Sequence, residues 1–147
     1  MDMTYHRESS AGYMTNWAAR LFLRALERRL GSGAGPMPVY FALQDGSALP
    51  QKELARIAAV EQPTMAATLA RMARDGLIRR TPDPDDRRSA LISLTAQGKR
   101  RADAALEAAR AVNAAAMEAL NPAERKQYFA ILGKIVAALD ADGNGEG

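Results

Sequence analysis

Two adjacent arginines, Arg87 and Arg88, follow prolines and aspartates in the segment PDPDDRRS, residues 82–89. A guanidinium group carries its N–H donors in a planar fork that matches the oxygens of a phosphate group. The surrounding stretch, residues 71–101, has nine Arg or Lys against four Asp, a net charge of +5 within a chain whose total is +3. A basic excess gathered in one stretch indicates a surface that binds phosphate groups.

Few residues could perform other chemistry. Cysteine is absent, which excludes disulfides, thiolate metal ligands and sensing of oxidants through thiols. The single histidine, His6, lies in an N-terminal stretch that we expect to be mobile, and one histidine does not make a metal site. The sequence shows no nucleophile–base pair, no glycine-rich phosphate loop and no cluster of metal ligands. We therefore predict no catalytic residue, no metal and no cofactor, and conclude that the chain is not an enzyme.

Length and composition favour a single domain with an ordinary core. The chain has 147 residues, of which 48% are hydrophobic and 25% charged. The longest stretch without a charge, residues 30–44, is broken by Gly and Pro and is too short to span a membrane. The N-terminus lacks the apolar block of a secretory signal. We expect a cytoplasmic protein that does not interact with membranes.

Apolar periodicity predicts long helices at both ends of the chain and short helices between them. The predicted helices cover residues 14–30 and 39–44, a segment starting at Pro50, a segment from Pro63 to the stop at Gly76, residues 96–120, and a last helix from Pro122. Two β-prone runs, LIRRT and ALISLT, flank PDPDDRRS and predict a hairpin with a long exposed tip. Thr95 and Asn121 are expected helix caps, and the tail 140–147 is expected to be disordered. The predicted fold class is mainly α with a small β-hairpin wing (α+β).

Residues 50–94 therefore run helix, turn, helix, strand, charged loop, strand, which is the order of a winged helix-turn-helix. In that fold the second helix enters the major groove of DNA and the hairpin reaches the neighbouring backbone or minor groove. On the predicted second helix, the apolar residues Leu69 and Met72 lie on one face, and we expect the opposite face to be exposed. The residues of this exposed face are Thr64, Ala67, Thr68 and Arg71.

The motif DPDDRRSALISLTAQG, residues 83–98, resembles the wing and following helix of the MarR family of bacterial transcription regulators. ELARIAAVEQPTMAATLARMARDGLI, residues 53–78, resembles the family's helix-turn-helix. The resemblance covers essentially the whole chain and implies one domain, 1–147. Its winged helix-turn-helix would span about 36–95, and its dimerisation helices about 12–31 and 96–140. The implied function is that of a homodimeric regulator, by family expectation a repressor, that binds a pseudo-palindromic operator in double-stranded DNA.

The resemblance also implies which side chains meet DNA. In the wing, Arg88 is expected in the minor groove, Arg87 on a phosphate, and Asp86 orienting an arginine. At the helix-turn-helix, matching or adjacent positions are Gln62, Pro63, Thr64, Ala67, Thr68 and Arg71. Ala67 departs from relatives that carry a base-reading Arg there, which weakens the expectation of direct readout. Gln51 and Lys52 either clamp a phosphate or form an ordinary solvated helix start.

In the family a small ligand, often an aromatic acid or phenol, binds between the DNA-binding lobe and the dimerisation helices. The resemblance makes Tyr13, Trp17, Arg20 and Tyr40 candidates for such a pocket, and an arginine suits a carboxylate ligand. The simpler alternative is that the aromatic residues belong to the core.

A protein-docking module is the competing class, because winged helices also serve as docking domains. The paired arginines of the hairpin favour DNA, since a docking domain does not need them.

Overall fold

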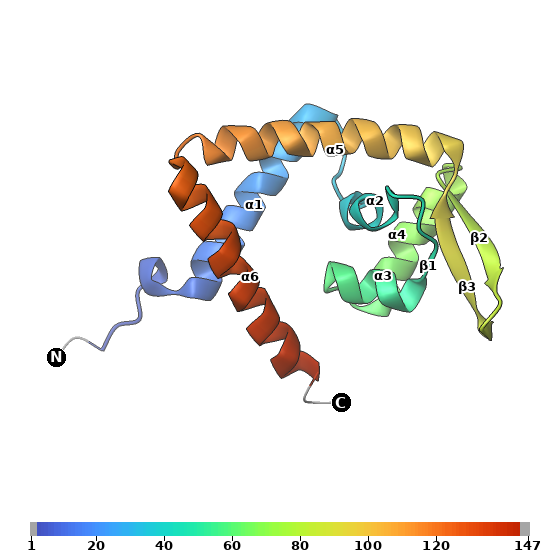
Figure 1. The fold of residues 1–147 in the computed structure, drawn as a ribbon, viewed down its shortest axis with the longest axis horizontal. Coiled ribbons are helices and arrows are strands. Elements are labelled where there is room, and N and C mark those ends of the chain that lie inside the picture. Colours follow the sequence, from blue (N-terminus) through green and yellow to red (C-terminus); the bar gives the residue numbers. More distant parts are fainter. Residues whose placement is uncertain (1–2, 145–147) are drawn as a thin grey trace. The chain divides into compact units, whose positions relative to one another are not determined.

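The computed structural model describes residues 3–144, and within them helices dominate and the strands form one small antiparallel sheet (Figure 1). The predicted fold class, mainly α with a β-hairpin wing, is confirmed. In chain order the elements are η1 (Arg7–Ser9), α1 (Ala11–Leu30), α2 (Met37–Leu43), β1 (Leu49–Pro50), α3 (Gln51–Ala58), α4 (Gln62–Arg74), β2 (Ile78–Asp83), β3 (Asp86–Leu94), α5 (Ala96–Met117) and α6 (Pro122–Asn144).

The chain divides within α5 into two compact units, Met1–Arg110 and Ala111–Gly147. The first unit contains every strand and the helices α1 to α4 together with the first part of α5. The second contains the end of α5 and the whole of α6.

Several boundaries differ from the sequence prediction for local reasons. Helix α1 begins at Ala11 rather than residue 14, because the Ser10 side chain caps it by accepting a hydrogen bond from the Tyr13 amide at 3.2 Å. The expected place of Pro50 at a first helical position is wrong. Pro50 has an extended backbone, caps α3, and pairs with β3 as part of the two-residue strand β1. A strand this short leaves no periodicity in the sequence.

The sheet has the order β1-β3-β2, so β3 is its central strand. Ile92 of β3 faces Leu49 on one side and Arg80 on the other. The core of the first unit lies where α2, α3, α4 and β3 meet. Its most deeply buried large side chains are Val39, Leu43, Leu54, Leu69, Met72 and Ile92.

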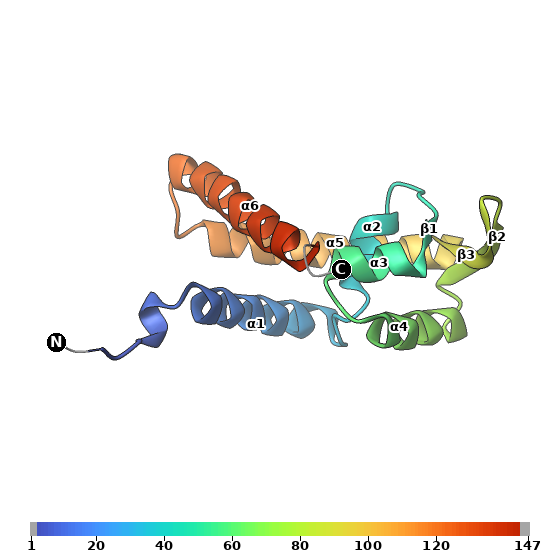
Figure 2. The same cartoon turned by 90° about the horizontal axis from the view of Figure 1, so that it is seen from below.

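The turn between α3 and α4 depends on a left-handed backbone at Ala59, with φ 53°. Its amide bonds back to the carbonyls of Ala55 and Arg56 and so closes α3. An alanine in this conformation costs about 1 kcal/mol relative to glycine. The tight turn lets α4 start at Gln62, four residues after α3 ends. Figure 2 shows α3 and α4 joined by this short turn.

A tight joint connects the end of α4, the hairpin and the start of α5. The Thr95 hydroxyl donates to the Gly76 carbonyl at 2.7 Å and accepts from the Gly98 amide at 3.0 Å. The Thr95 amide in turn donates to the Leu77 carbonyl at 3.0 Å. Gly98 packs so closely on Leu77, the residue before β2, that a Cβ at Gly98 would overlap the Leu77 carbonyl oxygen. The expected cap at Thr95 is therefore present and also ties α5 to the residues that follow α4.

Helix α6 starts with the expected capping box. The Asn121 side chain accepts from the Glu124 amide, and the Glu124 carboxylate accepts from the Asn121 amide, both at 2.9 Å. The prediction of disorder from residue 140 is wrong as far as Asn144, because α6 continues to that residue. Residues 145–147 of that predicted tail lie outside the described residues.

Among the described residues, no helix is long and apolar enough to cross a membrane. The same residues contain no group of three or more His, Cys, Asp or Glu side chains arranged to hold a metal ion.

Gly98→Ala should lower the free energy of unfolding by about 2 kcal/mol or more, because the new methyl group must displace backbone rather than a flexible side chain. Gly12→Ala is the matched control, since Gly12 also lies in the first turn of a helix but has nothing within 4 Å of the added Cβ. Chemical denaturation of both variants measures the difference. Equal stability of the two would show that the joint at Leu77 accommodates a side chain.

Candidate functional site

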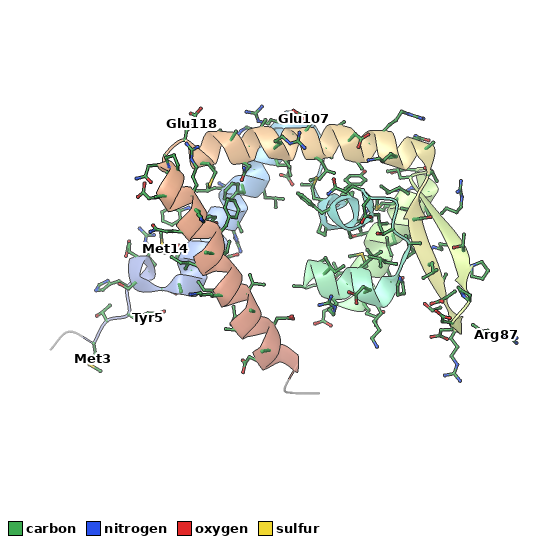
Figure 3. All side chains as sticks on the ribbon, in the orientation of Figure 1. Met3, Tyr5, Met14, Arg87, Glu107 and Glu118 are labelled. Carbon is green, nitrogen blue, oxygen red and sulfur yellow. The ribbon has the colours of Figure 1, made fainter. Side chains whose placement is uncertain are left out.

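The hairpin of β2 and β3 carries Arg87 near its turn, with the side chain pointing away from α2, α3 and α4 (Figure 3). Asp83 pairs with Asp86, so only Pro84 and Asp85 form the turn. The predicted long loop is therefore wrong, and Arg87 and Arg88 belong to strand β3. Neighbouring residues of a strand project to opposite faces, so the two guanidinium groups serve different sides of the hairpin.

Two aspartates fix the backbone of this turn. The Asp83 carboxylate accepts from the Asp85 amide at 2.9 Å, and the Asp86 carboxylate accepts from the Arg88 amide at 3.0 Å. These bonds stabilise a short turn, so the hairpin does not need the longer tip that we predicted. The expectation that Asp86 orients an arginine differs from the observed contact, because its partner is the backbone of Arg88.

The side chains of Arg87 and Arg88 are exposed. Among residues 3–144, no carboxylate lies within ion-pair distance of either guanidinium group. A rigid strand therefore presents two unneutralised positive charges to solvent.

Helix α4 exposes most of the face that the sequence predicted. Gln62, Pro63, Thr64 and Ala67 are all exposed in its first half. Its N-cap residue, Glu61, makes no side-chain capping bond, and Pro63 has no N–H, so the first turn offers the Gln62 and Thr64 amides as donors at the positive end of the helix dipole. Such a helix start can receive a phosphate group.

Thr68 is a correction. Its side chain is buried, with 8% exposed, and its hydroxyl donates to the Thr64 carbonyl at 3.2 Å. The expectation that it projects with Thr64 and Ala67 is wrong, because Thr68 lies at the edge of the face that packs on the core. At the start of α3, Gln51 is half-buried and Lys52 is exposed.

A cavity of about 450 Å³ lies within the first unit, beside the inner side of α4. The linker between α1 and α2, helix α2 and helix α5 supply its other walls. Its wall is largely apolar, and three charged side chains and a phenol also line it: Arg71, Asp75, Arg101 and Tyr40.

Two of these charged groups act on the Tyr40 phenol. Burial raises the pKa of the Tyr40 phenol above its ordinary value of 10.0; the positive charge of Arg101 opposes the shift and the negative charge of Asp75 adds to it. Tyr40 therefore stays neutral across the physiological range and can donate and accept a hydrogen bond.

The candidate ligand residues divide between two places. Tyr40 lines the cavity, whereas Tyr13, Trp17 and Arg20 lie on α1 outside it, all exposed. Trp17 instead contacts Tyr13 edge to face, with centroids 6.2 Å apart, and lies under the Arg7 guanidinium at 5.9 Å.

Sequence reasoning did not assign Arg101 or Asp75 to a pocket, and it placed Arg71 only at DNA. One signal was present for Arg101: a cation in the first turns of a helix opposes the helix dipole, which suggests a role other than helix stability. The tertiary approach of α2, α4 and α5 leaves no such mark in the sequence.

Comparison with known proteins identifies the family. A model of the MarR family matches residues 42–90, which include α3, α4, β2 and the basic end of the wing. The transcriptional regulator HosA of Escherichia coli is 31% identical over 97 residues, which are 66% of this chain and 72% of that protein.

One further curated relative and one solved structure are also similar to this chain. The HTH-type transcriptional repressor NicR of Pseudomonas putida is 34% identical over 103 residues, 70% of this chain, and the match spans 63% of that repressor's length. The structure of BpsR of Bordetella bronchiseptica, whose DNA binding is regulated by 6-hydroxynicotinic acid, has a TM-score of 0.80 at 24% identity. The match covers 90% of this chain and 97% of that one, and it shows the shared fold.

The buried phenol generates a prediction for alkaline pH. Because the folded-state pKa of Tyr40 is raised, the stability that it contributes is complete below its unfolded pKa and is lost as pH rises through the folded pKa. The free energy of unfolding should therefore fall more steeply above about pH 10 in the wild type than in Tyr40→Phe. Denaturation midpoints at several pH values measure both slopes, and parallel slopes would mean that Tyr40 ionises as easily folded as unfolded.

Proposed function

The chain belongs to the MarR family of transcription regulators, and from that membership we propose a sequence-specific repressor that binds a pseudo-palindromic operator as a homodimer. Repression is the activity named for the Pseudomonas relative, of which the match spans 63%. The observation that carries the proposal is the pair Arg87 and Arg88, exposed, without carboxylate partners among the described residues, and held on a strand whose turn is fixed by Asp83 and Asp86.

Helix α4 would supply sequence recognition and the wing would supply affinity. Thr64 and Ala67 lie on the exposed half of α4, where small side chains allow close approach to base edges and thymine methyl groups. Gln62 and Pro63 open the same helix, whose free amides suit a phosphate. Gln51 and Lys52 would add a backbone contact at the start of α3. Thr68, being buried, would support this surface rather than touch a base.

Dimerisation would use the terminal helices. Helices α1 and α6 leave many large apolar side chains exposed, which is unusual on the surface of a monomer. On α6 they are Tyr128, Phe129, Ile131, Ile135, Val136 and Leu139, and on α1 they include Tyr13, Met14, Trp17, Leu21 and Leu23. A two-fold dimer would pair two α4 helices with two half-sites, which explains the proposed palindromic operator.

The cavity beside α4 would bind the effector. Its volume of about 450 Å³ suits a small organic molecule, and Tyr40 is the predicted ligand residue that lines it. A ligand that prefers one arrangement of the dimer over the other would change DNA affinity by the ratio of its affinities for the two. Tyr13, Trp17 and Arg20 would contribute only if a second copy closes the pocket.

Arg88→Ala should weaken binding to the operator about tenfold or more, because it removes a charge-assisted contact worth about 1.5–3 kcal/mol. Arg110→Ala is the control, since Arg110 is also exposed but lies on α5 and pairs with Glu107. Fluorescence anisotropy on a labelled operator fragment measures both. Wild-type affinity in the Arg88 variant would remove the wing from the mechanism and favour a docking module.

Ile135→Glu should convert the dimer to a monomer, because it places a charge in the centre of the exposed apolar face of α6. Ala137→Glu is the matched control, since residue 137 lies about half a helical turn away, on the opposite face, and is also exposed. Sedimentation velocity distinguishes the two states. A dimer that survives the Ile135 substitution would exclude this face as the interface.

A further inference from the structure

Thr68 is a polar residue on a face of α4 that is otherwise apolar. Its side chain is buried, and apart from the Tyr40 phenol it is the one buried polar side chain among the described residues. Its neighbours on the core face of the helix are Met65, Leu69 and Met72, all buried. Burying a hydroxyl group costs free energy unless the group is hydrogen-bonded, so its presence here needs a specific cause.

The stability of α4 does not explain this hydroxyl group. It donates to the Thr64 carbonyl at 3.2 Å. In an α-helix, however, that carbonyl already accepts from the amide four residues later, which is the amide of Thr68 itself. Threonine is also a poorer helix former than alanine or leucine, because its branched side chain loses rotamer freedom in a helix. The bond to Thr64 therefore satisfies the hydroxyl group without supplying anything that the helix lacks.

The same hydroxyl oxygen accepts from the Arg71 side chain, whose Nη2 lies 3.5 Å away. A hydroxyl group has one donor and two acceptor positions, so it can bond to Thr64 and Arg71 together. Arg71 is exposed and has no ion-pair partner among residues 3–144, and within these residues the contact with Thr68 is its one side-chain hydrogen bond. The hydroxyl group of Thr68 is thus what holds the Arg71 guanidinium.

We propose that Thr68 is a positioning residue for DNA binding: its buried hydroxyl group holds the Arg71 guanidinium along the exposed half of α4, and Thr68 itself does not touch DNA. The inference rests on the proposed function and deepens it, because it gives the recognition helix a residue that acts through another.

The place of Arg71 on the helix explains why it needs such a contact. Residues 64, 67 and 71 follow one another at helical spacing and share one face, while Arg71 also borders the cavity beside α4. A long side chain at this border has two surfaces on which it can lie. A helical side chain covers the turn that precedes its own Cα, and the bond to Thr68 fixes the guanidinium over that turn, near Thr64 and Ala67.

Holding the guanidinium before DNA binds raises affinity, because less rotamer freedom is lost when the contact with DNA forms. The contact between Arg71 and Thr68 is long for an N–H···O bond, so it favours one arrangement of the side chain rather than locking it. The expected effect on DNA affinity is therefore several-fold.

The first test separates the hydroxyl group from the shape of the side chain. Thr68→Val keeps the shape and removes the hydroxyl group, so it should weaken operator binding about three- to tenfold, as the loss of one hydrogen bond does. Thr68→Ser keeps the hydroxyl group and should bind within about twofold of the wild type. Fluorescence anisotropy on a labelled operator fragment measures these affinities.

Chemical denaturation of Thr68→Val is the control for a merely structural role. Its midpoint should not fall, because the substitution leaves no buried polar group without a partner. Wild-type DNA affinity in Thr68→Val, or a loss of affinity that comes with a lower midpoint, would overturn the proposal.

The second test asks whether Thr68 acts through Arg71. In an Arg71→Ala background, Thr68→Val should cause no further loss of DNA affinity, because the side chain that Thr68 positions is gone. In an Arg74→Ala background it should cause the same loss as in the wild type, because Arg74 is also exposed on α4 but contacts Asp75. Equal losses in the two backgrounds would overturn the role of Arg71.

The third test needs no DNA. NMR relaxation gives the order parameter of each arginine Nε–H group, which reports how rigidly that side chain is held. We expect a higher order parameter for Arg71 than for Arg74 in the wild type, and a decrease at Arg71 alone in Thr68→Val. An Arg71 order parameter that is the same in the wild type and in Thr68→Val would overturn the proposal even if the protein binds its operator.

Failure of the wild type to bind any operator would instead contradict the proposed function, and with it the role of Thr68 in DNA binding. The order parameters would still report whether Thr68 holds Arg71, so the two failures are distinguishable.

Discussion

The joint at Leu77 is the constraint on which the arrangement of α4, the hairpin and α5 depends, and these include the elements proposed to bind DNA. Thr95 bonds to the carbonyl of Gly76 and to the amide of Gly98, and Gly98 packs without a side chain against the Leu77 carbonyl. The end of α4, the base of the hairpin and the start of α5 are thus held by the Thr95 hydroxyl and by close backbone packing at Leu77. The proposed contact of α4 and the hairpin with one duplex requires a fixed relation between these two elements, which this joint can supply. The same joint brings Arg101 of α5 to the cavity that α4 lines.

The sequence was sufficient for the elements whose signals are local. The capping box at Asn121 and Glu124 and the cap at Thr95 depend on residues a few positions apart, and both are present. Features set by tertiary contact were not predictable in this way. The strand β1 consists of two residues stabilised only by pairing with β3, and the burial of Thr68 depends on what packs against α4. The expected long wing tip failed because the aspartates stabilise a two-residue turn rather than a loop.

The candidate site shows the same division. Arg87 and Arg88 could be found from residue type and motif, because a wing displays its side chains without the help of other elements. The cavity could not, because its polar groups come from α2, α4 and α5 and carry no common motif. Arg71 illustrates the consequence: the sequence indicates a DNA contact, and only the packing of α4 against its neighbours reveals the second surface.

The central claim is that this chain recognises a particular DNA sequence rather than phosphate in general. Fluorescence anisotropy of the purified protein, on its own upstream intergenic DNA and on a scrambled duplex across a salt series, tests it most directly. We predict much tighter binding of the native fragment at physiological salt, with one dimer per site. Weak binding of both duplexes that falls in parallel as salt rises would contradict the claim and leave the wing as a generic phosphate surface.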